Sequence, residues 1–198
     1  MRSFKIAAVF LTIFTFVAIH AVAQTNEGNS SDIELENISP IEKVGYKKLK
    51  MSHWVSHTEI LIDASPEQVW SVLIDTESYP KWNEIILKMD GKIEDKGKVD
   101  VLFKAGPKAK PRLFHNTLFV KEGVEFYWSQ VQAAGIKDRH CFRVEATDGG
   151  KTKFIQSDQA LGGLTWLIGK TASKIQIDVY PMFNRSLKAE VERRYLKK

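Results

Sequence analysis

The sequence has almost no cysteine: Cys141 is the only one in 198 residues. An internal disulfide is therefore impossible, and the fold must be stabilised by core packing even in an oxidising compartment. Cys141 stands between His140 and Phe142 in a strand-like run, which favours a buried, unreactive thiol over a nucleophile.

Common catalytic signatures are also missing. The sequence contains no G-x-S-x-G, C-x-x-C, H-E-x-x-H, Walker or dinucleotide-binding glycine motif. His57 and Glu59 alternate on one predicted strand, but two ligands are too few for a metal site, and a solvated outer face is the more common role. We therefore predict no metal and no cofactor. The formal net charge of +5 is too mild to indicate a nucleic-acid partner.

The N-terminus has the pattern of a secretory signal. Arg2 and Lys5 precede an apolar run over residues 6–19, which is in the range of a signal sequence and shorter than a membrane span. Residues 21–23 (Ala-Val-Ala) give the small-x-small pattern that signal peptidase requires. We predict a signal peptide over residues 1–23, cleavage before Gln24, and export to a periplasm or to the extracellular space. The alternative is an uncleaved N-terminal anchor.

The predicted mature chain has two parts. Residues 24–50 open with a polar stretch that is poor in aromatic residues, so we predict a flexible leader there. Residues 51–198 are predicted to form one domain, because this length suffices for a single well-buried core. The regular pattern of that domain starts with an alternating strand over residues 54–62.

A capped helix follows this strand. Ser65 can cap the helix, Pro66 suits its first position, and Gln68 completes a capping box. Residues 79–82 then break the helix and allow one short second turn. Further strands are predicted without intervening helices, which indicates an antiparallel meander; they cover residues 86–93, 98–104, 112–120, 124–131, 138–146 and 152–159.

The C-terminal part is predicted to be one long helix. Apolar residues recur at helical spacing from Leu164 to Val191. Gly162 and Gly163 are expected to form the tight passage from the last strand into this helix. Pro181 lacks a backbone donor, so we expect it to kink the helix near Ile177 without ending it.

Several local motifs accompany this order of elements: Ile60-x-Ile62-Asp63-Ala64-Ser65-Pro66-Glu67-Gln68-Val69-Trp70, then Asp75 through Tyr79-Pro80-x-Trp82-Asn83, His140-x-Phe142, Gly150 to Phe154, Gly162-Gly163-Leu164 and Phe183-Asn184-x-x-Leu187-Lys188. Together they resemble the START-like (SRPBCC, Bet v 1-like) superfamily, and specifically its polyketide cyclase/dehydrase and lipid transport branch. The resemblance covers about residues 55–194.

The resemblance implies an α+β helix-grip fold. A curved, seven-stranded antiparallel sheet would wrap around the long C-terminal helix, in the order strand, two short helices, six strands, helix. It also implies an apolar cavity between sheet and helix that holds a small hydrophobic or amphipathic molecule, lipid-like or polyketide-like. The sequence is compatible, because a sheet face and a helical stripe each need apolar cover.

The candidate ligand-binding residues are assigned as a group, because a single aromatic residue on a strand is more often part of the core. We take the phase of Ile60 as the inward one on the first strand. The full set is Ile60, Ile62, Trp82, Phe103, His115, Trp128, His140, Phe142, Phe154 and Asp158.

His115, His140 and Asp158 are also the candidates for catalysis. If the strands form a meander, all three can point into one cavity, where a histidine held by a carboxylate can act as a general acid or base. The more common role of such residues is to satisfy a hydrogen bond near the rim. The basic loop over residues 104–112 is either a contact for anionic lipid headgroups, which would bring the protein to a membrane surface, or a solvated hairpin turn.

Three functions remain open from the sequence. The first is a module that binds or carries a small hydrophobic molecule or lipid. The second is a cyclase, dehydratase or hydrolase that acts on such a molecule through the cavity His and Asp residues. The third is a partner-binding domain whose interior is filled by side chains. The sequence does not indicate an oligomeric state.

Overall fold

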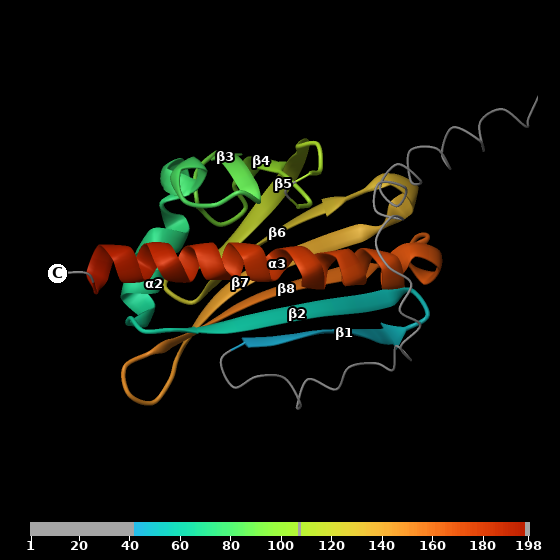
Figure 1. Ribbon diagram of the computed structural model, residues 1–198. Coiled ribbons are helices and arrows are strands. Elements are labelled where there is room, and N and C mark those ends of the chain that lie inside the picture. Colours follow the sequence, from blue (N-terminus) through green and yellow to red (C-terminus); the bar gives the residue numbers. More distant parts are fainter. Residues whose placement is uncertain (1–41, 107, 197–198) are drawn as a thin grey trace, which may run out of the picture.

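The computed structural model describes residues 42–106 and 108–196. The predicted signal peptide, its cleavage site and residues 24–41 of the predicted leader lie outside the described residues. One antiparallel sheet and one long helix dominate the fold (Figure 1). The strands are β1 (Glu42–Lys50), β2 (His53–Ile62), β3 (Ile86–Asp90), β4 (Lys98–Phe103), β5 (Arg112–Lys121), β6 (Glu125–Val131), β7 (Lys137–Ala146) and β8 (Thr152–Leu161).

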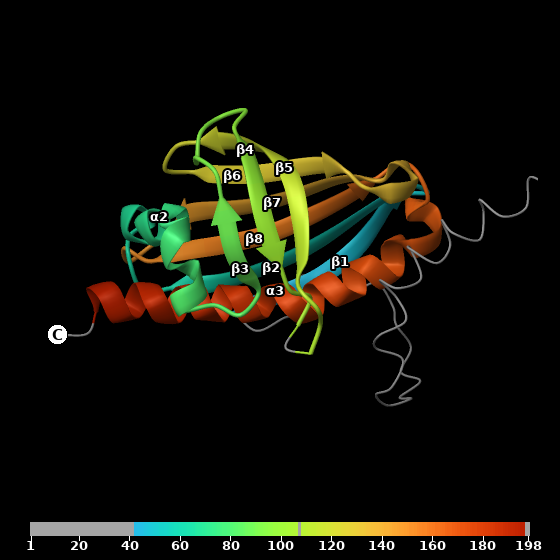
Figure 2. The same cartoon turned by 90° about the horizontal axis from the view of Figure 1, so that it is seen from above.

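The helices complete this order. The α-helix α2 (Pro66–Ile74) and the 3-10 helix η2 (Thr76–Lys81) follow β2, the single turn η3 (Ala133–Gly135) joins β6 to β7, and α3 (Thr165–Tyr195) closes the chain. The sheet has the order β1-β2-β8-β7-β6-β5-β4-β3. It curves around α3, which lies along its concave face (Figure 2). The α+β helix-grip architecture is therefore confirmed.

The number of strands differs from the prediction. The sheet has eight strands, not seven, because residues 42–50 form β1 instead of belonging to a leader. β1 pairs antiparallel with β2, and the Tyr46 ring packs against Trp54 at 5.9 Å between centroids. The lysine-rich composition of β1 does not predict a strand. Lysines are nevertheless typical of an exposed edge strand, because they block pairing with a further strand.

Local signals fix the start of α2. The backbone N–H of Gln68 donates to the Ser65 hydroxyl, and the Ser65 N–H donates to Gln68 Oε1 at 3.0 Å, so the predicted capping box is present. The buried face of this helix carries Val69, Trp70 and Leu73 into the core. The Trp70 indole also donates to Glu122 at 2.8 Å, which ties α2 to the turn between β5 and β6.

The C-terminal half of α3 closes the apolar core. Phe183 is fully buried and contacts Phe142 and Phe154 of the sheet, with centroids 5.6 and 6.3 Å apart. The amide of Asn184 donates to the Thr58 hydroxyl, and Lys188 donates to the Leu61 carbonyl. These polar contacts hold α3 against β2 at a fixed position along the strand.

Pro181 lies inside α3, and the helix continues past it, as predicted. Figure 2 shows that α3 bends, so that its N-terminal half follows the curvature of the sheet.

The turn from β8 into α3 is tight, as predicted. Gly162 and Gly163 both have positive φ, at 70° and 49°. A Cβ atom on Gly163 would lie 2.1 Å from the Ala134 carbonyl oxygen, so only glycine fits there. No helix of the described residues is long and apolar enough to cross a membrane.

Candidate functional site

A cavity of about 440 Å³ lies between the sheet and the N-terminal half of α3. Its apolar wall comes from β4, β5 and β6 on one side and from α3 on the other, and it includes Val101, Phe103, Phe114, Trp128, Ile168, Ala172, Ile175 and Val179. The volume is in the range of small-molecule sites, which are usually concave, mostly apolar and equipped with a few polar groups.

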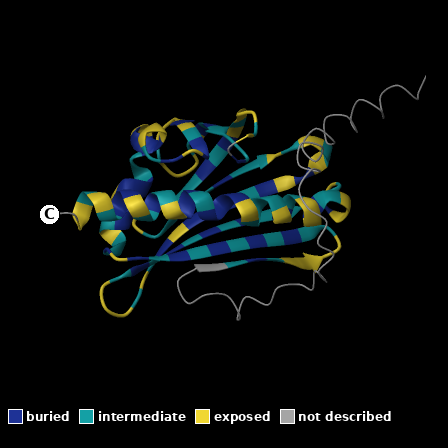
Figure 3. Ribbon diagram, in the orientation of Figure 1, coloured by how far each residue is buried: buried dark blue, intermediate teal, exposed yellow. Residues whose placement is uncertain are grey.

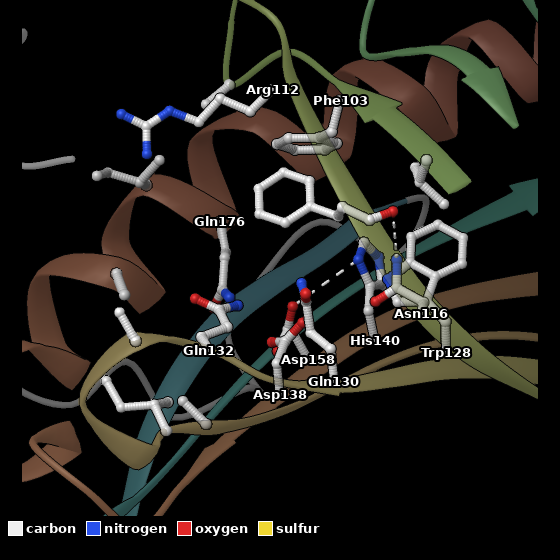
Figure 4. Close-up of a pocket in the computed structure, with 18 of the residues that line it drawn as sticks. Phe103, Arg112, Asn116, Trp128, Gln130, Gln132, Asp138, His140, Asp158 and Gln176 are labelled. Atoms are coloured by element: carbon white, nitrogen blue, oxygen red, sulfur yellow. Dashed lines mark hydrogen bonds and ion pairs between the residues drawn. The ribbon is translucent and has the colours of Figure 1, made fainter. Parts of the chain in front are cut away.

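The polar groups of this cavity gather around His140. Figure 4 shows Asp138, Asp158 and Gln130 beside His140, with Phe103 and Arg112 across the cavity from them. Their positions follow from the sheet: Asp138 and His140 are two residues apart on β7 and share a face, and His140 is directly opposite Asp158 of β8. Tyr180 and Gln176 reach the same region from α3.

His140 is held rigidly and kept neutral. Its ring stacks on Phe142 and Tyr180 with centroids 4.6 and 4.4 Å away, and only 4% of the residue is exposed. The amide of Gln156 donates to His140 Nε2 at 2.8 Å, which assigns the ring proton to Nδ1. That nitrogen lies 3.8 Å from Asp158 Oδ2. Burial lowers the pKa of His140 to about 3, so the ring is uncharged at neutral pH.

Asp138 and Asp158 form a buried carboxyl pair. Burial and the charge of Asp138 raise the pKa of Asp158 well above its ordinary value, and burial also raises the pKa of Asp138. Two adjacent carboxyls can hydrogen-bond only if one of them carries a proton. Asp158 Oδ1 is buried and accepts no hydrogen bond within the described part of the chain, which fits a protonated oxygen that donates to Asp138.

Side chains from α3 and β2 support this pair. The Tyr180 hydroxyl donates to Asp158 Oδ2 at 2.5 Å, and burial raises the pKa of Tyr180, so the phenol stays protonated. Gln176 also hydrogen-bonds Asp158, while its own Oε1 accepts from the Ser56 hydroxyl at 2.9 Å. Gln132 hydrogen-bonds Asp138. The polar end of the cavity is therefore an ordered network that carries no positive charge of its own.

This arrangement is better suited to hydrogen bonding than to proton transfer at neutral pH. An efficient general acid or base has a pKa near the working pH, whereas the pKa of His140 is about 3 and its Nε2 already accepts from Gln156. A ligand hydroxyl, carbonyl or amide can exchange hydrogen bonds with the carboxyl pair. A ligand carboxylate would instead meet two buried acidic groups at the same end.

Four of the ten predicted ligand-binding residues line the cavity: Phe103, Trp128, His140 and Asp158. Four others point to the inner side of the sheet but belong to the packed core away from the cavity: Ile60, Ile62, Phe142 and Phe154. Trp82 packs on Tyr79 and Phe183, and its indole donates to Ser78, so it too lies outside the cavity lining.

The predicted strand phase of His115 is wrong. Its side chain is 73% exposed on the outer face of the sheet, where Nδ1 pairs with Asp100 at 2.7 Å. The inward positions of β5 are taken by the neighbours Phe114 and Asn116, which line the cavity. Large groups occupy both phases of this strand, so alternation alone did not identify the inward one.

The sequence reasoning also missed cavity residues. Asp138 could have been found, because it stands two residues before His140 on the same predicted strand. Tyr180 follows Ile175 and Gln176 at helical spacing and could have been placed on the inward stripe of α3.

The two residues considered as metal ligands, His57 and Glu59, pair with each other at 3.0 Å on β2. Among the residues that the structure describes, no three His, Cys, Asp or Glu side chains are grouped to hold a metal ion.

Solved structures with the same fold share little sequence with this chain. A START superfamily protein from Mycobacterium smegmatis is 17% identical, with a TM-score of 0.56 over 70% of this chain and 97% of that one. The ZhuI aromatase/cyclase from Streptomyces sp. R1128 is 14% identical, with a TM-score of 0.57 over 72% of this chain and 95% of that one. Norcoclaurine synthase from Thalictrum flavum, in complex with dopamine and hydroxybenzaldehyde, is 12% identical, with a TM-score of 0.55 over 78% and 91%.

No curated protein matches the sequence. The family model described as polyketide cyclase / dehydrase and lipid transport matches residues 53–192, which include β2 through most of α3 and every residue of the polar network. The predicted resemblance is therefore confirmed, and the chain belongs to the polyketide cyclase/dehydrase and lipid transport family of the START-like superfamily.

Proposed function

We propose that this protein is exported and binds or carries a small, largely apolar molecule in the cavity between the sheet and α3. The observation that carries the proposal is the cavity itself, about 440 Å³ in volume, with an apolar wall and one polar end. Its existence argues against a domain whose interior is filled by side chains. Export rests on the signal-like pattern of residues 1–23.

The polar end defines the kind of ligand. The hydrogen-bonded carboxyl pair of Asp138 and Asp158 stands against neutral His140 and Tyr180. A ligand with an uncharged polar group, such as an alcohol, ketone or amide, satisfies these groups. A fatty carboxylate places a like charge beside them in a site of low dielectric, which is unfavourable.

A direct test uses a cavity-filling variant with a matched control. Ala172→Phe adds a ring to the wall of the cavity, whereas Ala189→Phe places the same ring on the exposed side of the same helix. Titration with a medium-chain fatty alcohol, followed by calorimetry, should show binding by wild type and by Ala189→Phe and a loss of binding by Ala172→Phe. Equal binding by the two variants would contradict the proposed site.

A catalytic role is the second candidate, and the raised pKa of Asp158 favours it. A carboxylic acid whose pKa is raised keeps its proton to a higher pH, and the protonated form can donate a hydrogen bond to a carbonyl oxygen and polarise it, which assists cyclisation or dehydration. Under this candidate, Asp158→Ala abolishes turnover while ligand binding is nearly unchanged. Under the binding function, the same variant weakens binding and there is no turnover to lose.

A further inference from the structure

Large apolar side chains are exposed at one end of the sheet. They are Leu49 and Met51 at the turn between β1 and β2, Val131 at the end of β6, and Trp166 and Leu167 at the start of α3, with exposed fractions between 51% and 74%. None of these side chains is needed to close the core. Exposed apolar side chains that gather at one place usually mark an interaction site.

Backbone contacts bring these three segments together. The N–H of Gly162 donates to the Ser52 carbonyl at 2.8 Å, which places the start of α3 beside the β1–β2 turn. Gly163 lies against Ala134 of η3, so the loop that follows Val131 touches the same place. Figure 1 shows the β1–β2 turn, the β6–β7 connection and the start of α3 at one end of the molecule, and Figure 3 shows exposed residues on them.

The same end is rich in positive charge. The three segments comprise residues 45–52, 131–137 and 161–174 and contain six basic and no acidic residues. The whole chain is nearly balanced, with 29 Lys and Arg against 24 Asp and Glu. We call these three segments, with their exposed apolar side chains, the basic end.

The basic end borders the cavity. Val131 and Ala133 of the β6–β7 connection and Ile168 of α3 belong to the cavity lining, as do Ala105 and Arg112 of the β4–β5 loop. A partner bound at the basic end would therefore lie next to the cavity wall. An apolar molecule could then move between the partner and the cavity with little exposure to water.

We propose that the basic end is a docking surface for an anionic lipid bilayer. Its apolar side chains, above all Trp166 and Met51, would enter the interfacial region, and the lysines would meet the headgroups. Trp is the residue type that membrane interfaces favour, and a mixture of apolar and basic groups is the chemistry that binds anionic lipid. A second copy of the chain fits less well, because two surfaces without acidic residues repel each other.

The docking surface does not depend on the identity of the cavity ligand. Trp166 and Leu167 lie outside the cavity lining, so their removal should leave binding of a soluble ligand unchanged. Failure of the docking proposal and failure of the proposed ligand binding can therefore be told apart in the same set of variants.

The test is co-sedimentation of the purified protein with vesicles of phosphatidylcholine alone or of phosphatidylcholine mixed with phosphatidylglycerol. We expect binding to the mixed vesicles that weakens with added salt, and little binding to phosphatidylcholine alone. In the triple variant Lys47→Glu, Lys48→Glu and Lys50→Glu, the partition coefficient into the mixed vesicles should fall by at least about tenfold. The matched control is the triple variant Lys81→Glu, Lys92→Glu and Lys121→Glu, on exposed lysines outside the basic end.

The apolar part is tested in the same way. Trp166→Ala with Leu167→Ala should reduce sedimentation with mixed vesicles, whereas Tyr195→Ala with Leu196→Ala, on exposed apolar residues at the other end of α3, should not. Absence of binding to phosphatidylglycerol, or equal losses in the two double variants, would overturn the proposal. So would a protein dimer that forms without lipid and dissociates only in the Trp166 variant, because the surface would then serve self-association.

Discussion

The phenolic hydroxyl of Tyr180 in α3 donates a hydrogen bond to Asp158 Oδ2 of β8, with 2.5 Å between the two oxygens, at the interface between the helix and the sheet. Both residues are almost completely buried, and Asp138 stands next to this pair. A buried carboxyl is costly unless it is neutral or hydrogen-bonded, and Tyr180 supplies a hydrogen bond to this one. The contact therefore joins the polar end of the cavity to the element that closes it.

The carboxyl pair should control which ligands bind. In wild type, a fatty alcohol should bind at least about tenfold more tightly than the fatty acid of the same chain length, because the acid meets a like-charged group in a buried site. Asp158→Asn keeps the size of the side chain and removes the acid, so the preference should shrink. Competition calorimetry measures both affinities, and His115→Ala on the outer face is the control. A wild-type preference for the fatty acid would refute this reading.

His140 should make stability depend on acid. Its folded-state pKa of about 3 is below the ordinary value of 6.5, so its contribution is fully present above pH 6.5 and is lost as the pH falls from 6.5 towards 3. Between pH 6.5 and 4.5 we expect wild type to lose about 2 kcal/mol through this group. His140→Asn cannot be protonated there, so urea unfolding at the two pH values should show a smaller loss. Parallel pH profiles would mean that His140 is not held neutral.

The carboxyl pair should act in the opposite direction. The pKa of both Asp138 and Asp158 is raised above the ordinary value of 3.8, so their contribution is present below pH 3.8 and is lost as the pH rises through the raised values. The stability of wild type relative to Asp158→Asn should therefore fall between pH 4 and pH 8. Unfolding free energies of the two proteins across this range test the sign. A difference that grows with pH would show that the pair is ionised and stabilised by a charge.

Gly163 should tolerate no side chain. Alanine there would have a positive φ and would also place Cβ 2.1 Å from the Ala134 carbonyl oxygen. Gly123 has a positive φ as well, at 71°, but an added Cβ meets nothing within 4 Å. Gly123→Ala should cost about 1 kcal/mol and Gly163→Ala clearly more, in the region of 2–4 kcal/mol. Equal costs in thermal unfolding would show that the α3 passage can move aside.

Local signals allowed much of the fold to be predicted. The capping box of Ser65 and Gln68 and the tight turn at Gly163 depend on residues that are neighbours in the sequence. Both could therefore be predicted without knowledge of tertiary contacts. The helical stripe of α3 likewise follows from the spacing of its apolar residues. β1 was missed because its lysine-rich strand is stabilised by pairing with β2, which is a tertiary contact.

The site was harder to predict than the fold. Whether His115 or Phe114 faces the cavity depends on the register of β5 against β4, and a shift of one residue exchanges the two faces. The core and the cavity wall share one inner face of the sheet, so Phe142 and Trp128 could not be separated by pattern. Their roles differ only because the C-terminal half of α3 packs tightly on the sheet and the N-terminal half leaves space.

The central claim is that the cavity holds a small, largely apolar molecule. Native mass spectrometry of the protein, purified without added lipid, tests it most directly when wild type is compared with Ala172→Phe and Ala189→Phe. We predict an additional bound mass on wild type and on Ala189→Phe that is absent from Ala172→Phe. Wild-type protein without bound mass, which also fails to take up a fatty alcohol, would contradict the account.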